Sequence, residues 1–183
     1  SVVVVINNKP RFIRRSRGYV PEPIHCDGLE QTSILAMGSD LKNAFAVNKG
    51  SEVLVGPHIG DLENASTHKT LEWTIERYKN LFSIQPEKII IDSHPQFFSS
   101  RLGEKIGESF HLSVVPVQHH HAHIASVMAE HNLRGLVLGI AMDGTGYGPD
   151  GTIWGGEFLL CKGNQYQRLA HIHAAPLPGG EKA

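Results

Sequence analysis

Apolar runs alternate with polar turn residues along the first half of the chain and predict a series of short strands. The β-branched run at 2–6 and the run at 11–15 flank Asn7 and Asn8, a pattern typical of a hairpin. A glycine and two prolines then mark 18–24 as a linker. Further strands are expected at residues 34–37, 44–47, 52–55, 88–92 and 112–117.

Apolar residues at helical spacing predict three helices between these strands. The first follows a cap at Ser66 or Asn64 and repeats its apolar side chains from Leu71 to Phe82. The second is expected over 97–110 and the third over 119–131. After the linker, the order of elements is therefore βββαβαβα.

The strand pattern starts again after residue 134. Strands are expected at 135–142, 152–160 and 165–173, and the first runs into the glycine-rich turn Asp143-Gly-Thr-Gly146. A βββαβαβα lobe followed by a second βββ start is the plan of the duplicated, actin-like and ribonuclease-H-like (ASKHA) α/β fold. Because about half a lobe remains, the second lobe would be truncated. We expect the end of a preceding domain and a linker over 1–20, a first lobe over 21–134 and an incomplete second lobe over 135–183.

Composition and charge narrow the classes of partner. Lysine and arginine total 17 against 18 aspartates and glutamates, so no global field favours nucleic acid or a membrane, and we expect neither as a partner. No apolar run approaches the roughly 20 residues of a membrane span. Cys26 and Cys161 lie far apart without a CxxC pair, which favours a reducing, cytoplasmic setting.

One basic cluster is an exception to this even distribution of charge. It comprises Lys9, Arg11, Arg14, Arg15 and Arg17. Such a cluster can bind phosphate or nucleic acid. We favour a solvated or interdomain surface, because no aromatic residues are interleaved for base stacking.

Five of the twelve histidines fall between residues 119 and 131. His119 and His123 are four apart, so on a helix they share one face with Cβ atoms about 5 to 6 Å apart. Neutral imidazole suits zinc and iron(II), and a carboxylate from Asp143 would complete a His, His, Asp set with open coordination positions. The alternative for a histidine run is packing and solvation, and we favour it for His120, His121 and His131.

Two glycine-rich turns occupy equivalent places in the two lobes. Gly38-Ser-Asp40 follows the first strand of the first lobe, and Asp143-Gly-Thr-Gly146 follows that of the second. Small residues let backbone N–H groups approach an anion closely. A pair of such turns favours a nucleotide bound between the lobes.

At these residues the sequence resembles the HypF family, the carbamoyltransferases of [NiFe]-hydrogenase maturation. The shared motifs occur in the same order over nearly the whole chain. They are Arg14-Arg-Ser-Arg-Gly-Tyr-Val-Pro21, Gly38-Ser-Asp-Leu-Lys-Asn-Ala-Phe45, His58-Ile-Gly-Asp-Leu62, Val117-Gln-His-His-His-Ala-His123, Asp143-Gly-Thr-Gly-Tyr-Gly148, Trp154-Gly-Gly-Glu157 and Leu177-Pro-Gly-Gly180. Residues 1 to about 18 resemble the end of a YrdC-like domain, and the rest resembles the front of a TsaD-like domain.

The resemblance implies a concrete activity. Members of the family use carbamoyl phosphate and ATP, form carbamoyl adenylate and pass the carbamoyl group to the C-terminal cysteine of the partner HypE, for cyanide ligand synthesis. His119, His123 and Asp143 match the metal-binding and catalytic positions, for iron or zinc. The expected contacts to nucleotide or carbamoyl intermediate are Ser39, Asp40, Lys42, Gly144, Thr145, Gly146, Gly155 and Gly156.

The sequence also lacks parts of the family pattern: the acylphosphatase-like domain, the zinc-finger cysteines, most of the YrdC-like domain and a second metal carboxylate. We therefore expect this piece to fold its first lobe, to bind metal or nucleotide weakly and not to turn over. Two other classes stay open. An actin-like small-molecule kinase would use Asp143 as a base without needing the histidine pair. In a non-catalytic metal-binding or interaction module, the histidine run would be adventitious.

Smaller motifs carry smaller expectations. Asp92-Ser-His94 follows a strand, where substrate contact and a turn or helix cap are equally expected. His58 and Asp61 are expected to serve a loop. His171 and His173 share one face of a strand without a third ligand and are expected to be structural.

Overall fold

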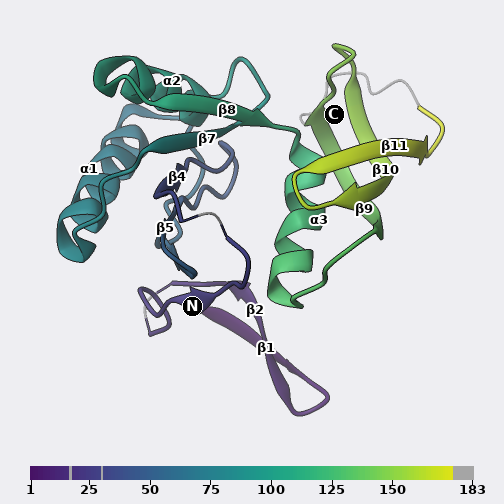
Figure 1. Ribbon diagram of the computed structural model, residues 1–183, viewed down its shortest axis with the longest axis horizontal. Coiled ribbons are helices and arrows are strands. Elements are labelled where there is room, and N and C mark those ends of the chain that lie inside the picture. Colours follow the sequence, from purple (N-terminus) through teal and green to yellow (C-terminus); the bar gives the residue numbers. More distant parts are fainter. Residues whose placement is uncertain (17, 30, 175–183) are drawn as a thin grey trace. The chain divides into compact units, whose positions relative to one another are not determined.

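The computed structural model describes residues 1–16, 18–29 and 31–174 (Figure 1). Two expectations, for Arg17 in the basic cluster and for the motif at 177–180, lie outside these residues. The chain divides into two compact units, with the boundary in the sequence between Val117 and Gln118. Among the described helices, none is both long enough and apolar enough to cross a membrane.

The first unit holds a two-stranded hairpin and a six-stranded sheet. The hairpin pairs β1 with β2, and Asn7 and Asn8 both have positive φ, as a tight turn between twisted strands requires. The sheet has the order β3-β6-β5-β4-β7-β8, with antiparallel pairs up to β4 and parallel pairs from β4 to β8. The strands are β1 (Val2–Ile6), β2 (Lys9–Arg14), β3 (Ile24–His25), β4 (Ile34–Ala36), β5 (Ala46–Lys49), β6 (Glu52–Val55), β7 (Lys88–Asp92) and β8 (Ser113–Val117).

Two helices complete this unit. Helix α1 (Ala65–Phe82) begins at Asn64, whose side chain accepts hydrogen bonds from the backbone of Ser66 and Thr67. Its stripe at helical spacing joins the core formed with the central strands. The second helix, α2 (Phe98–Phe110), packs on β7 and β8 between which it lies in sequence (Figure 1). The buried side chains of α1 are Leu71, Thr74, Ile75 and Tyr78.

The second unit is one helix on a three-stranded antiparallel sheet. Helix α3 (His119–Glu130) precedes β9 (Val137–Tyr147), β10 (Ile153–Lys162) and β11 (Gln165–His171), whose order is β11-β10-β9. The core of the unit is small and consists of Ile124, Met128, Ala141, Trp154, Leu159 and Cys161. Because α3 packs on β9 and β10, the unit begins at Gln118, earlier than the lobe boundary expected between 134 and 135.

The prediction of a glycine-rich turn at 143–146 is wrong, because β9 continues through these residues to Tyr147. Gly146 pairs with Trp154 and Met142 with Gly156, so that the three residues 143–145 lie opposite Gly155 alone. This is a β-bulge, which bends a strand and redirects its side chains. A further difference is β3, which forms at the end of the segment expected to be a linker.

Candidate metal centre

The first turn of α3 is fixed by Gln118, a buried residue at its N-cap. The Gln118 side-chain oxygen accepts a hydrogen bond from the backbone N–H of His121 at 2.9 Å. This cap satisfies one of the unpaired N–H groups that every helix start presents. It therefore sets where the histidines of the first turn begin.

His119 and His123 project from one side of this turn, as their spacing predicts. Their Nε2 atoms lie 3.1 Å apart. Asp143 Oδ2 lies 3.0 Å from Nε2 of His119 and 3.7 Å from Nε2 of His123. One donor atom from each residue thus falls within 4.8 Å of the others. The structure brings together the three residues that the sequence predicted as ligands.

The separations fit a small cation. With metal–nitrogen bonds of about 2.0–2.1 Å, two donors subtending 90–110° lie about 2.9–3.4 Å apart. The pairs of His119 with His123 and with Asp143 match this spacing, at 3.1 and 3.0 Å. Asp143 Oδ2 is buried and, although it lies 3.0 Å from His119 Nε2, it accepts no hydrogen bond of acceptable geometry. A buried carboxylate oxygen in that condition is costly unless a positive charge compensates it, so the residues fit a bound metal.

The bulge in β9 aims the Asp143 carboxylate. Asp143 Oδ1 accepts a hydrogen bond from the backbone N–H of Gly144 at 2.9 Å, which leaves Oδ2 turned toward the histidines. A hollow of about 390 Å³ lies beside the carboxylate, so there is room for a ligand next to Asp143 and His123. It is lined by His123, Ile124, Ser126, Val127 and residues 139–143.

The other histidines of the run divide as expected between packing and solvent. His120 and His121 are buried, and burial lowers the pKa of each imidazole. The His121 ring lies tilted beside the Tyr166 ring, with Nε2 3.3 Å from the Gly163 carbonyl oxygen, whereas His131 is exposed. His120 is not remote from the centre, however, because its Nε2 lies 4.0 Å from Asp143 Oδ2.

An ion pair between Arg168 and Glu157 supports β10, the strand opposite the bulge. The sequence analysis included Glu157 in a motif but did not single out Arg168. Arg168 on β11 donates to both carboxylate oxygens of Glu157, at 2.6 and 2.8 Å, and Glu157 is only 1% exposed. Burial raises the pKa of Glu157, but Arg168 and the Gly155 N–H outweigh it and the net pKa is lowered. The available signal was a pair of opposite charges on neighbouring predicted strands.

Asp150 and Trp154 extend this ion pair. The Arg168 guanidinium lies 4.0 Å from the centroid of the Trp154 ring, and Asp150 accepts hydrogen bonds from Trp154 Nε1 at 3.0 and 3.1 Å. Hydrogen bonds from the Thr152 hydroxyl and backbone N–H, and then from Trp154, lower the pKa of Asp150 to about 2.

The predicted phosphate contacts of the first unit lie in the loop after β4. Asp40 directs its carboxylate at the start of α2, where it accepts hydrogen bonds from the backbone N–H groups of Phe98 at 2.7 Å and Ser99 at 2.9 Å. The backbone N–H of Lys42 donates to Asp61 at 2.7 Å. These three hydrogen bonds hold the loop, and Asp61 therefore serves a loop as expected.

Asp40 allows a direct test of this structural role. Replacing it by alanine removes a cap that lies 58 positions away in sequence from the helix it serves. We expect the free energy of unfolding to fall by about 0.5–2 kcal/mol, and Asp40→Asn, which keeps one acceptor, to lose less. Urea denaturation followed by circular dichroism measures both, with Glu63→Ala on the exposed surface as the control. Equal stability of Asp40→Ala and the wild type would contradict the capping role.

The remaining predicted residues take these places. Asp92 accepts the backbone N–H of His94 at 2.9 Å, which is the turn alternative for that motif. Ser39 lies in the β4 loop beside Asp40, and His171 is exposed at the end of β11. Gly144 and Thr145 form the bulge with Asp143, Gly155 faces the bulge, and Gly146 and Gly156 form the pairs that flank it.

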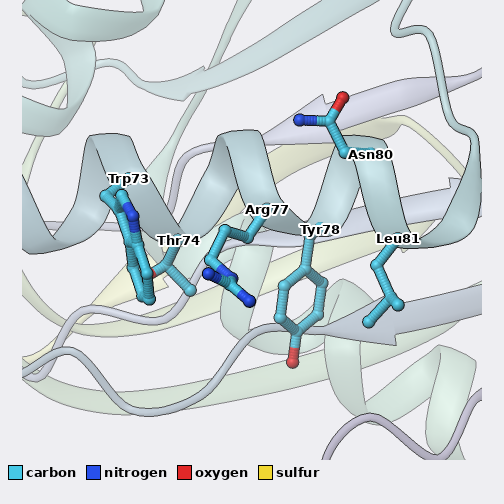
Figure 2. A pocket seen from close by; sticks show the side chains of 6 residues that line it. All are labelled: Trp73, Thr74, Arg77, Tyr78, Asn80 and Leu81. Carbon is cyan, nitrogen blue, oxygen red and sulfur yellow. The ribbon is translucent and has the colours of Figure 1, made fainter.

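A second hollow, of about 570 Å³, lies along α1 in the first unit (Figure 2). Figure 2 shows Trp73, Arg77 and Leu81 projecting from the helix, and the Arg77 guanidinium lies 4.6 Å from the centroid of the Trp73 ring. Arg77 is the one charged residue among its lining residues. The larger hollow therefore lacks the clustered acids and imidazoles that catalysis or metal binding needs.

Comparisons with known proteins show the family to which the chain belongs. The family described as the HypF Kae1-like domain matches residues 29–130, and the second subdomain of a Kae1-like carbamoyltransferase matches residues 139–183. The carbamoyltransferase HypF of Synechocystis sp. is 45% identical over 100% of this chain, and that of Rhizobium leguminosarum bv. viciae is 43% identical over 100%. The chain spans 24% of the length of each.

Solved structures give the same result. A crystal structure of full-length HypF in the phosphate- and nucleotide-bound form is 45% identical, with a TM-score of 0.89 over 98% of this chain and 23% of its own. HypF of T. kodakarensis is 39% identical, with a TM-score of 0.88 over 98% of this chain and 24% of its own. With a family match over more than half its length, this chain belongs to the HypF family of carbamoyltransferases.

Proposed function

We propose that this chain contributes the carbamoyl-transferring site of a HypF protein and that His119, His123 and Asp143 hold its metal. The convergence of three donor atoms within 4.8 Å carries the proposal. Membership of the HypF family supports the carbamoyltransferase class. An iron(II) or zinc ion held there would supply Lewis-acid polarisation of a phosphoryl or carbonyl oxygen.

The protein groups of the site bind and orient. Asp143 and His123 stand on the wall of the 390 Å³ hollow, and the neighbouring residues 139–142 and Val127 give it an apolar side. A carbamoyl adenylate placed there would meet the acceptor with its phosphate oriented, which favours attack by a thiolate. We propose that the acceptor is the C-terminal cysteine of HypE and that AMP leaves as the carbamoyl–sulfur bond forms.

ATP and carbamoyl phosphate complete the proposed reaction. A solved relative is described as phosphate- and nucleotide-bound, which supports a nucleotide site in this family. We propose nucleotide contacts at 144–146 and Gly155 around the bulge of the second unit. Buried, unpaired Cys26 and Cys161 agree with the reducing, cytoplasmic setting proposed from the sequence.

We also propose the duplicated ASKHA fold. In the first unit, β6-β5-β4 are antiparallel and β7 and β8 continue in parallel from β4. In the second unit, α3 is followed by a meander of three antiparallel strands, β9 to β11, which repeats the first half of that arrangement. These two observations support the proposal that 21–134 and 135–183 are duplicated lobes, the second of them truncated.

The metal assignment predicts a specific loss of binding. His119→Ala and His123→Ala should each weaken Zn²⁺ binding by about tenfold or more, because each removes one of three ligands. Competition with a chromophoric chelator measures this affinity, and His131→Ala, an exposed histidine of the same segment, is the matched control. Retained wild-type affinity in both ligand variants would refute the site.

In a full-length HypF carrying the equivalent of His119→Ala, transfer of the carbamoyl group to HypE should fail while carbamoyl adenylate still forms. The reason is that adenylate formation is assigned to the YrdC-like domain. Following adenylate by mass spectrometry and carbamoylated HypE in the same reaction separates the two steps. Equal failure of both steps in a folded variant would contradict the proposed division of labour.

A further inference from the structure

We propose that His120 is a positioning residue, whose Nε2–H group holds Asp143 Oδ2 toward His119 and His123. Gln118 determines that the ring proton of His120 resides on Nε2. The inference rests on the metal function proposed above. The sequence analysis gave His120 to packing, and its burial agrees with that. The polar surroundings of its ring show more than packing.

The orientation of the Gln118 amide is the first step. Its oxygen accepts the backbone N–H of His121 at 2.9 Å, and its nitrogen lies 3.4 Å from the carbonyl oxygen of Tyr147. Only the amide oxygen of Gln118 can accept from the His121 N–H, and only its NH₂ group can donate to the Tyr147 carbonyl. Two independent neighbours therefore fix the same orientation of the amide. The amide nitrogen of Gln118 therefore faces His120.

The tautomer of His120 follows from this orientation. The Gln118 nitrogen lies 3.0 Å from His120 Nδ1. Because that nitrogen can only donate, Nδ1 must present its lone pair, and the ring proton resides on Nε2. His120 thus presents a donor where His119 and His123, as ligands, must present lone pairs.

The donor faces the carboxylate of the third ligand. His120 Nε2 and Asp143 Oδ2 are both buried, lie 4.0 Å apart, and make no hydrogen bond of acceptable geometry, although Oδ2 lies 3.0 Å from His119 Nε2. A buried donor and a buried acceptor in this condition each carry a desolvation cost that their mutual approach removes. Donors that bind the carboxylate of a metal ligand fix its orientation, and their loss typically lowers metal affinity about 10- to 100-fold.

Two substitutions separate this role from packing. In His120→Asn the amide reaches the place of Nδ1, so the contact with Gln118 is preserved while the donor at Nε2 is lost. In His120→Gln the longer amide can return an N–H to the place of Nε2. We expect His120→Asn to bind Zn²⁺ about 10- to 100-fold more weakly than the wild type, and His120→Gln to recover most of that loss.

The experiment uses the whole chain with Zn²⁺ alone, titrated against a chromophoric chelator, and circular dichroism to compare the folded fractions. His131→Asn is the matched control. The opposite order of the two variants, equal losses in both, or wild-type affinity in His120→Asn would overturn the proposal. A wild-type chain that binds no Zn²⁺ would instead refute the metal function.

Nitrogen-15 NMR of the histidine rings tests His120 without using metal affinity. We expect the His120 signals of the Nε2–H tautomer in the wild type and a change in that pattern in Gln118→Met, which cannot donate to Nδ1. An Nδ1–H tautomer in the wild type would overturn the positioning role, whatever the Zn²⁺ affinities.

Discussion

Replacing Arg168 by methionine should lower the free energy of unfolding of the second unit by about 3–5 kcal/mol, because it leaves Glu157 as a buried charge without a partner. Methionine keeps an unbranched apolar side chain at this position and removes the guanidinium, which lies over the Trp154 ring and donates to Glu157 at 2.6 and 2.8 Å. Urea denaturation followed by tryptophan fluorescence suits this unit, since Trp154 is 3% exposed whereas Trp73, in the other unit, is 60% exposed.

The effect should depend on pH. In the wild type the pKa of Glu157 is lowered, so the pair stabilises the fold above the carboxyl's ordinary pKa and loses this contribution as the pH falls through the lowered value. In Arg168→Met, burial without a partner raises that pKa and protonation relieves the charge. The deficit relative to the wild type should therefore shrink from pH 7.5 to pH 5.

A second substitution identifies the cause of the deficit. Glu157→Gln in the Arg168→Met background removes the charge and retains an acceptor for the Gly155 N–H, and it should restore most of the lost stability. Arg11→Met on the exposed strand β2 is the matched charge removal and should change stability by less than about 0.5 kcal/mol. A deficit that persists unchanged in the double variant would show that lost packing, not the unpaired charge, destabilises Arg168→Met.

Local signals predicted most of the elements. The turn at Asn7 and Asn8, the cap at Asn64 and the apolar stripe of α1 depend on residues a few positions apart, and each forms as expected. The same is true of His119 and His123, whose shared face follows from helical periodicity alone. Patterns that involve residues only a few positions apart can be recognised in the sequence, because a helix or a tight turn fixes the backbone geometry between those residues.

Features that depend on pairing between distant segments were not predictable in this way. The bulge at 143–145 exists only relative to β10, and the run Asp143-Gly-Thr-Gly146 by itself resembles a turn. Asp40 caps a helix that begins 58 residues later, so no local pattern distinguishes that role from phosphate binding. The part of His120 in the site likewise depends on the amide of Gln118 and on β9.

Gly146 is the position where a single methyl group should disable the metal centre. A Cβ there would lie 2.5 Å from His120 Cε1, 2.7 Å from His120 Nδ1 and 3.1 Å from His119 Cβ. Its backbone is an ordinary strand, so Gly146→Ala would act through this collision and not through backbone strain. Displacement of the first turn of α3 moves the imidazoles away from Asp143, and we expect Zn²⁺ affinity to fall about tenfold or more with a loss of about 1–3 kcal/mol in stability.

Gly139→Ala is the matched control, because it also places a methyl group between β9 and α3. Its Cβ would collide with Cδ1 of Ile124 and lie 2.5 and 2.6 Å from Cγ1 and Cγ2 of the same side chain, and no metal ligand is among the contacts. Gly139→Ala should therefore lose stability by overpacking but keep its Zn²⁺ affinity, and Ile124→Ala beside it, which removes all three carbons, should relieve the overpacking. If the two glycine variants lost affinity equally, the close approach of Gly146 to the histidines would not be what places the ligands. Separation of the two variants would assign the metal geometry to this one contact between strand and helix.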